Sequence, residues 1–411
     1  MPREKTMTSG LLKLCLLSTL CLSLAATAGS STRKRAWITM GDAAFRQTKT
    51  AAPDMVSIGS RQLRVGGSSE KVHAIVVDEG RLPAVAGAIH QRLGQCGGFM
   101  YHANEAEARA ALERRRLAPP AQTYRIQQRD VVEPLLASMQ EQTIASTIIA
   151  LSGFPNRYYR SQSGVDASNW LLAAWRELGA GRDDISVAQV VHRGYPQASV
   201  TLTIAGSDLA DETVVVGAHL DSILSAGMSE TARAPGADDD ASGIASMTEA
   251  LRALIHSGYR PRRTIQLIAY AAEEAGLRGS QDIARQFKQA GRKVAGVLQL
   301  DMTNYKGAAN DIYLITDYTD GQQNEFIAQL VSAYLPGLKL GYDKCGYGCS
   351  DHASWDALGY PVSMPFESSM ARDNPHIHTS RDTLANSGNQ TAHALKFARL
   401  AAAYMVELSS Q

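Results

Sequence analysis

The sequence predicts an α/β protein whose central sheet is mixed, largely parallel and covered by helices on both faces. From residue 186 onward, short apolar runs alternate with amphipathic segments long enough to be helices. This alternation is typical of parallel strands joined by helical crossovers. In one run Val214, Val215 and Val216 follow one another, and three consecutive β-branched residues indicate a strand buried on both faces. We expect a small separate α/β unit in front of this domain.

The chain has 411 residues, of which 45% are hydrophobic and 20% charged, and its formal net charge is +1. A chain of this length and composition can bury one large core or two moderate ones. Because the net charge is near zero and the sequence shows no stripe of Lys and Arg, we expect no nucleic-acid partner.

The first residues are typical of a secretory signal peptide. Arg3 and Lys5 precede an apolar run over residues 11–24, and Ala26-Thr27-Ala28 offers a small-residue cleavage site. A buried helix or a membrane anchor is the alternative, but the run is short for a span and no second stretch of that length follows. We therefore predict a signal peptide over residues 1–28, a secreted (extracellular or periplasmic) protein, and no membrane contact after cleavage.

The next stretch, residues 29–122, is expected to be the small α/β unit. We predict a strand over residues 71–77 and helices over residues 82–93 and 105–115. Arg114-Arg115-Arg116 followed by Pro119-Pro120 is typical of an exposed, protease-sensitive junction, although a solvated helix end explains the arginines alone equally well. The unit is thus a pro-region or a retained accessory domain, and the main domain spans residues 123–411.

The main domain is predicted to begin with helices and to continue with alternating strands and helices. The first two helices are expected over residues 131–151 and, behind Asp166 as N-cap, over residues 170–178. The predicted strands cover residues 186–192, 199–204, 213–219, 264–271, 294–301 and 311–315. The later helices cover residues 241–256, 280–289, 323–334 and 392–408.

Polar residues stand at the ends of three of these strands. His219 ends the run over residues 213–219 and Asp221 lies two residues beyond it, Glu273 and Glu274 follow the next strand, and Asp301 ends the one after it. In open α/β sheets, sites are built just beyond the carboxyl ends of the strands. His219 is therefore a candidate metal ligand, and Asp221 is suited to accept the other N–H of its imidazole.

Two further motifs add donors of the same kind. Asp238, Asp239 and Asp240 form a tight turn before a helix; they could be N-caps, but adjacent carboxylates repel one another unless a cation is near. A second imidazole, His378, lies in a loop near the C-terminus. Two His and three carboxylates suit zinc and, less well, cobalt or manganese. Their charge suffices for two dications that share a carboxylate, a set suited to metal-assisted hydrolysis with a free carboxylate as general base.

These motifs closely resemble the co-catalytic two-zinc aminopeptidases of the bacterial leucyl aminopeptidase type, peptidase family M28. The resemblance runs from about residue 124 to residue 408 and implies a zinc-dependent exopeptidase fold. The motifs that carry it are His219-Leu220-Asp221-Ser222, residues 236–243, Glu273-Glu274, Leu300-Asp301-Met302, residues 345–352 and Ile377-His378-Thr379.

The resemblance implies a role for each site residue. The ligands of the two Zn²⁺ ions would be His219, Glu274, Asp301, His378 and, bridging both ions, Asp239. Glu273 would be the general base, Tyr347 would help to hold the developing oxyanion, and Asp221 would be the partner of His219. By the same resemblance Asp238 and Asp240 serve the turn, and His376 is not a ligand.

The resemblance also implies a disulfide and a substrate pocket. The disulfide would join Cys345 and Cys349, which in an oxidising compartment leaves Cys96 as the odd cysteine of the mature chain. An apolar pocket for the N-terminal residue of the substrate would be formed by Met302, Ile315, Met364 and Phe366. The chain departs from the family at Met370 and Asp373, where related enzymes often carry aromatic residues. Met adapts to many side chains; Asp373 could favour a basic residue or could only cap the turn before Pro375.

The expected function is that of a monomeric metalloaminopeptidase that removes an N-terminal residue, preferably a large hydrophobic one such as Leu, from peptides or proteins. We expect the N-terminal unit to inhibit in cis until the chain is cut near residues 114–123. A carboxypeptidase of related fold is an alternative, but it needs a cationic clamp, for which the motif loops offer only Arg278, Arg372 and Arg381. A metal-free binding ectodomain is a second alternative, but it would be expected to lose ligands, whereas all five ligand positions and Glu273 are present here. A glutaminyl-cyclase-like transferase shares the fold but works with one zinc, and five ligands that include a bridging Asp speak against it.

Overall fold

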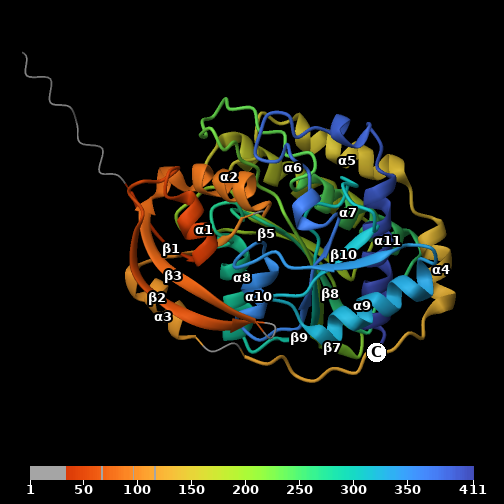
Figure 1. Ribbon diagram of the computed structural model, residues 1–411. Coiled ribbons are helices and arrows are strands. Elements are labelled where there is room, and N and C mark those ends of the chain that lie inside the picture. The colour runs from red at the N-terminus through yellow and green to blue at the C-terminus, as the bar shows by residue number, and fades with distance from the viewer. Residues whose placement is uncertain (1–33, 66–67, 96, 115–116) are drawn as a thin grey trace, which may run out of the picture. The chain divides into compact units, whose positions relative to one another are not determined.

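The computed structural model of this protein describes residues 34–65, 68–95, 97–114 and 117–411 (Figure 1). Two predictions lie outside the described residues: the signal peptide over residues 1–28, and Cys96 as the odd cysteine of the mature chain. Residues 34–411 form one compact unit. Among the helices that are described, none has the length and apolar character needed to cross a membrane.

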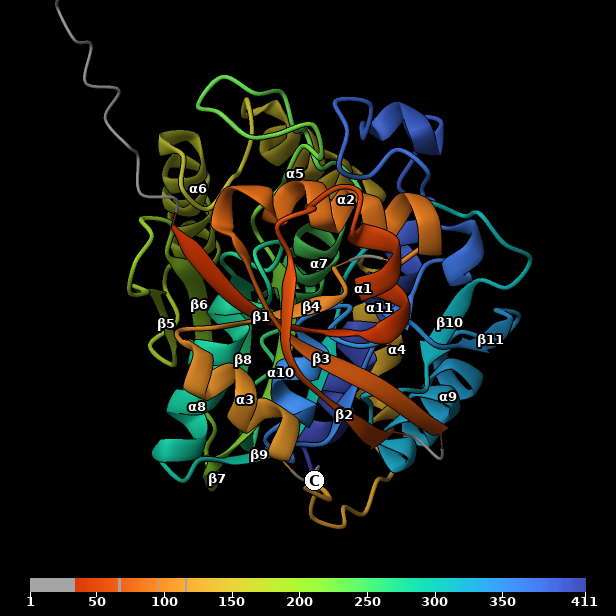
Figure 2. The same cartoon turned by 60° about the vertical axis from the view of Figure 1, so that its left-hand side comes forward.

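The N-terminal region, residues 34–114, has an antiparallel sheet of its own with strand order β2-β3-β1-β4 (Figure 2). Its strands are β1 (Arg35–Gly41), β2 (Val56–Val65), β3 (Ser68–Asp78) and β4 (Phe99–His102). Its helices are α1 (Asp42–Thr48), α2 (Leu82–Leu93) and α3 (Glu105–Glu113). The predictions over residues 71–77, 82–93 and 105–115 fall on β3, α2 and α3. The sequence analysis missed β2 because residues 56–63 are all exposed or half-buried, with Val56 55% exposed, so this part has no buried apolar face.

The C-terminal region, residues 117–411, is built on a six-stranded sheet of order β12-β9-β7-β8-β6-β5. The strands are β5 (Ile185–Val190), β6 (Ser199–Ile204), β7 (Leu209–His219), β8 (Arg263–Tyr270), β9 (Lys293–Gln299) and β12 (Val362–Ser363). The pairs β12·β9, β9·β7 and β7·β8 are parallel, whereas β8·β6 and β6·β5 are antiparallel. The prediction of a mixed, largely parallel sheet is confirmed.

Strand β7 is buried on both faces, as its run of valines predicts. Val214 and Val216 pack in the larger core with α7 (Ala241–His256) and α11 (Ala392–Ser409). Val215 points to the other face and packs against α8 (Arg278–Gln289) and α10 (His352–Asp356). Helices therefore cover both faces of the sheet (Figure 1).

Two of the predicted helix boundaries are wrong. The segment over residues 131–151 is two helices, α4 (Arg129–Ala137) and α5 (Glu141–Gly153). The chain turns between them because the Gln140 amide donates to Glu249 Oε1 on α7 at 2.6 Å. Helix α6 (Gln162–Leu178) has Ser161 as its N-cap, whose hydroxyl accepts the Gly164 amide at 2.9 Å; Asp166 is therefore not its N-cap.

A second small sheet, of order β11-β10-β13, completes the C-terminal region. It consists of β10 (Ile312–Ile315), β11 (Leu340–Asp343) and β13 (Pro365–Phe366), and α9 (Gly321–Tyr334) lies between β10 and β11 in the chain. Residues 117–128, which follow the N-terminal region, contain neither helix nor strand and are largely exposed.

Candidate metal centre

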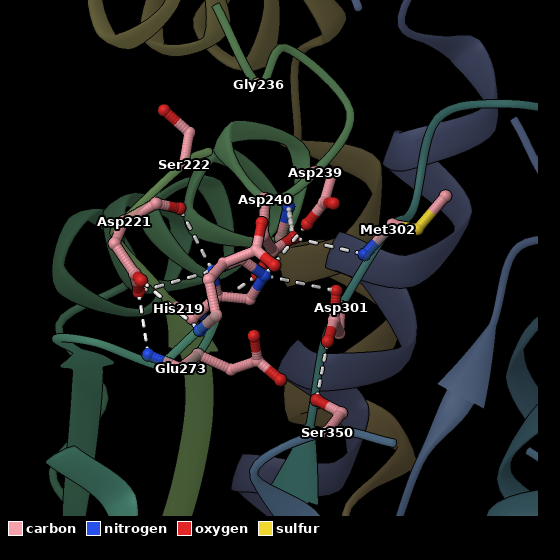
Figure 3. Close-up of polar contacts among 12 residues, drawn as sticks. His219, Asp221, Ser222, Gly236, Asp239, Asp240, Glu273, Asp301, Met302 and Ser350 are labelled. Atoms are coloured by element: carbon pink, nitrogen blue, oxygen red, sulfur yellow. Dashed lines mark hydrogen bonds and ion pairs between the residues drawn. The ribbon is translucent and has the colours of Figure 1, made fainter. Parts of the chain in front are cut away.

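The candidate metal ligands lie at one edge of the sheet because their strands are neighbours. His219 is the last residue of β7, Glu273 and Glu274 follow β8, and Asp301 follows β9. Since β9, β7 and β8 are adjacent and parallel, their carboxyl ends bring these side chains together. Asp239 reaches the same place from the turn before α7. Figure 3 shows the side chains of His219, Asp239, Asp301 and Glu273 converging.

Asp239 lies between two imidazoles. Its Oδ1 is 2.9 Å from His219 Nε2, and its Oδ2 is 3.1 Å from His378 Nε2. His378 Nε2 is also 2.9 Å from Glu274 Oε2, and His219 Nε2 is 3.5 Å from Asp301 Oδ1. The donors thus form two halves, one around each imidazole, with one carboxylate oxygen of Asp239 in each.

Asp240 is close to the half around His219, but its carboxylate accepts hydrogen bonds from backbone amides instead. Its Oδ2 accepts the His219 amide at 2.9 Å, and its Oδ1 accepts the amides of Gly243 at 2.9 Å and Met302 at 3.1 Å. Asp240 therefore ties together β7, the start of α7 and the loop after β9. This arrangement leaves Asp239 as the carboxylate of the triple that faces both imidazoles.

Several buried carboxylate oxygens of this centre have no hydrogen-bond partner among the described residues. They are Glu273 Oε1, Glu274 Oε1 and Asp301 Oδ1, and the three side chains are at most 3% exposed. Buried carboxylates without partners are costly unless a cation neutralises them. The donor set therefore fits divalent metal ions, and its two His and three carboxylates are ligand types that zinc accepts.

Burial and mutual repulsion shape the acidity of the centre. Burial, together with nearby Asp239, raises the pKa of Glu274 to about 7, although His378 opposes the shift. Burial also raises the pKa of Glu273 well above its usual range, and Glu274 contributes to the rise. For Asp239 burial acts in the same sense, but hydrogen bonds from His219 and His378 outweigh it and lower the pKa. Positive charge at this place is therefore strongly favoured.

Asp221 connects His219 to the glutamate pair. Its carboxylate accepts the amides of Glu273 at 2.8 Å and Glu274 at 3.2 Å. His219 Nδ1 lies 3.1 Å from the Asp221 carbonyl oxygen and 3.7 Å from its Oδ1. The predicted partnership with His219 thus involves the backbone of Asp221 more closely than its side chain, while the side chain fixes the loop after β8.

Three non-glycine residues at this edge have left-handed backbone conformations. They are Ala272 just before Glu273 (φ 57°), Met302 just after Asp301 (φ 59°) and His378 itself (φ 55°). Such conformations persist where the surrounding structure enforces them and often mark functional sites. Here each one turns the chain at a candidate ligand or at the candidate general base.

The sequence analysis missed Arg157, which hydrogen-bonds to two of the loops that carry the candidate ligands. Its fully buried guanidinium donates to the carbonyl oxygens of Leu220 at 2.7 Å and Gly236 at 2.9 Å, and to that of Pro235. Asp382 supports the same turn by accepting the Asp239 amide at 3.1 Å. Neither residue belongs to a recognisable spacing pattern, since Arg157 acts on backbone atoms far away in sequence, so the sequence held no signal for them.

The predicted pocket residues gather beside this centre. Met302, Ile315, Met364 and Phe366 belong to one buried cluster, together with Met370, Ile377, Cys345 and Cys349. Cys345 and Cys349 form a disulfide with Cα atoms 5.8 Å apart. Tyr347, between them in sequence, does not hydrogen-bond to the candidate ligands; its hydroxyl lies 2.7 Å from Thr39 Oγ1 of the N-terminal region.

The arginines considered for a carboxylate clamp lie elsewhere. Arg278 Nη1 donates to Glu79 Oε1 of the N-terminal region at 2.8 Å, and Arg372 and Arg381 are exposed. No pair of them forms a clamp beside the described donor set.

Comparison with known proteins gives consistent results. Residues 199–405 match peptidase family M28. Leucine aminopeptidase 1 of Arthroderma otae is 37% identical over 312 residues, which cover 71% of this chain and 81% of that protein.

Two solved structures resemble the described fold over 92% of this chain and 100% of theirs. The LapA aminopeptidase of Legionella pneumophila has 29% sequence identity and a TM-score of 0.78, and LapB of the same organism has 30% identity and a TM-score of 0.76. Since 92% is a larger share than residues 123–411 alone, both likenesses extend into the N-terminal region.

Proposed function

This chain belongs to peptidase family M28, and we propose that it is a metalloaminopeptidase that uses two zinc ions to remove an N-terminal residue, preferably a large hydrophobic one such as Leu, from peptides. The observation that carries the proposal is the position of Asp239, with one carboxylate oxygen toward His219 and the other toward His378. A carboxylate placed in this way can bridge two ions. Glu274 and Asp301 then complete one half each.

Glu273 is the residue we assign as general base. It lies beside the ligands, and its Oε1 has no hydrogen-bond partner among the described residues. Zinc bound to this centre would polarise the scissile carbonyl and lower the pKa of a water molecule. Glu273 would take the proton of the attacking water and pass it to the leaving amine.

Tyr347 is the residue we assign to the developing oxyanion. Burial raises the pKa of its hydroxyl to about 12, so it remains protonated and can donate a hydrogen bond to an oxygen that gains negative charge. In the full chain this hydroxyl is paired with Thr39 Oγ1, which is also 2.8 Å from His102 Nε2. The donor would become available to substrate only after Thr39 leaves.

We propose that the N-terminal region is a pro-region that covers the active site. A Cβ added at Gly97 would lie 2.8 Å from the carbonyl oxygen of Cys349 and 3.3 Å from Glu273 Oε1, so only glycine fits this approach to the general base. The Gly98 amide donates to the Gly348 carbonyl at 2.9 Å. The backbone of the N-terminal region therefore occupies space that a peptide substrate would need.

Glu79 anchors the same region farther from the metals. Its buried carboxylate accepts hydrogen bonds from Arg278 at 2.8 Å and from Arg160 at 2.5 Å. Arg278 also lies over the ring of Tyr101 in the N-terminal region, 3.8 Å from its centroid. Residues 117–123, which are mostly exposed, offer a place where the chain could be cut without breaking a helix or strand. We further propose that the protein is secreted and acts as a monomer.

The test is hydrolysis of leucyl-p-nitroanilide by the full chain, before and after limited cleavage with a serine endopeptidase that is then inactivated. We expect activity only after cleavage, with loss on chelation and recovery with zinc. Zinc bound at two ions per chain would support the two-ion assignment, and a single ion would overturn it. Equal activity before and after cleavage would overturn the pro-region. Release of C-terminal residues from an N-acylated dipeptide would instead favour a carboxypeptidase.

A further inference from the structure

Asp373 is a buried acid that the chemistry above does not use. It is 8% exposed, and its Oδ2 has no hydrogen-bond partner among the described residues. Capping the next turn does not account for it, because the His376 amide bonds to Asn374 Oδ1 at 3.0 Å. A buried carboxylate oxygen without a donor needs a reason, since burying it is costly.

Its loop carries two members of the apolar cluster that is predicted to form the substrate pocket. Asp373 lies in the chain between Met370 and Ile377, both of which belong to the apolar pocket cluster. It is also near the metal centre: His90 Nδ1 is 3.6 Å from Asp373 Oδ2, and the His90 ring lies 6.0 Å from the ring of His378. A buried carboxylate therefore stands in the loop that joins two members of this apolar cluster and lies near the metal centre.

In the full chain the N-terminal region fills this place. His90 comes from α2, is 9% exposed, and its Nδ1 has no hydrogen-bond partner among the described residues. A Cβ added at Gly94, at the end of the same helix, would lie 3.0 Å from the Met370 carbonyl oxygen. Helix α2 thus packs closely on the loop of Met370 and brings an imidazole nitrogen to Asp373.

We propose that Asp373 is a specificity-determining residue that makes the enzyme accept N-terminal Lys and Arg in addition to large apolar residues. The aliphatic stem of such a side chain would pack on Met302, Met364 and Phe366, and its cationic end would pair with Asp373. This inference rests on the proposed aminopeptidase activity and names a second substrate class for the same pocket.

The test compares p-nitroanilides of Lys and of norleucine, which has the same four-carbon chain without the terminal ammonium. The full chain is activated by limited cleavage, and kcat/KM is measured for wild type, Asp373→Asn and Asp183→Asn. The last variant is a control that removes the same charge from a side chain that is 87% exposed. We expect Asp373→Asn to lower kcat/KM about 30-fold for Lys and less than about threefold for norleucine, because a buried charge pair is lost only with Lys.

Each other outcome has a distinct meaning. Equal losses for both substrates would overturn the proposal, because Asp373 would then act on the α-amine or on the metal centre. Wild type that cleaves norleucine but not Lys would overturn it as well. Hydrolysis of neither substrate by wild type with zinc bound would instead count against the aminopeptidase. Activity of Asp373→Asn on norleucine shows in the same experiment that the variant folds.

Discussion

The N-terminal region and the metal centre treat buried polar groups in opposite ways. In the N-terminal region, His73 lies 2.7 Å from Asp42 and 3.2 Å from Ser57, and His102 is paired with Thr39. In the metal centre, Glu273 and Glu274 keep buried oxygens without hydrogen-bond partners among the described residues. Paired groups hold a fold together, whereas unpaired ones of the same type cost free energy and suit the binding of a cation.

His90 is the instructive exception in the N-terminal region. Its Nδ1 is also without a hydrogen-bond partner among the described residues, and it is the imidazole that faces Asp373 beside the metal centre. Unpaired atoms thus occur on both sides of the contact between α2 and the candidate active site. This pattern is expected of a cover that occupies a binding site temporarily.

The largest effect is expected from removing the metal ions. Chelation should abolish hydrolysis of aminoacyl-p-nitroanilides by the cleaved enzyme and lower the stability of the full chain by about 4 kcal/mol if zinc is present at 1,000 times its Kd. The reason is that the carboxylates of the centre then repel one another without a cation. Thermal unfolding with chelator, and again after zinc is restored, measures the change. An unchanged melting temperature would show that these acids do not hold a metal.

Glu273→Gln should reduce kcat by about 10²–10⁴-fold, because a general base is lost while the side chain keeps its size. Metal analysis of the purified variant should still find the wild-type zinc content. Glu274→Gln is the matched control: this neighbour faces His378, and its loss should lower the zinc content. If both variants lose metal equally, the division of roles within the pair is wrong.

Glu79→Gln should loosen the N-terminal region. The change leaves Arg278 buried without its charged partner, and breaking such a pair costs about 3–5 kcal/mol. We expect the uncut chain to show at least about tenfold more background activity than wild type. Glu105→Gln removes an exposed acid of the same region and should change little. Equal background activity in all three proteins would show that Glu79 does not hold the cover.

The smallest effect concerns pH. Burial, with Arg114 and Arg285 nearby, lowers the pKa of His102 to about 4, while the unfolded chain titrates near 6.5. Between these values the unfolded state binds one more proton, so His102 contributes stability above pH 6.5 that is lost as the pH falls toward 4. The full contribution is about 3 kcal/mol. Urea unfolding at pH 7 and 4.5 should show a smaller loss for His102→Gln than for wild type; parallel losses would contradict the assignment.

The sequence determined the central strand and the positions of the candidate donors beyond the ends of the strands. Three successive valines require burial on both faces, and acids or imidazoles directly after parallel strands must meet at one edge of the sheet. His219, Glu273, Glu274 and Asp301 could therefore be found by counting along the chain. Helix α2 could be predicted from the sequence as well, because Leu82, Pro83 and Gly94 mark its ends.

Only the tertiary structure decided which groups are paired and which are left free. Arg157 and Glu79 act through partners that are distant in the chain, and neither lies in a periodic pattern, so their roles follow from packing alone. The break between α4 and α5 likewise depends on Glu249 of another helix. Whether Asp373 caps a turn or keeps a free oxygen beside a pocket was undecided in the sequence, because burial and hydrogen bonding are properties of the folded chain.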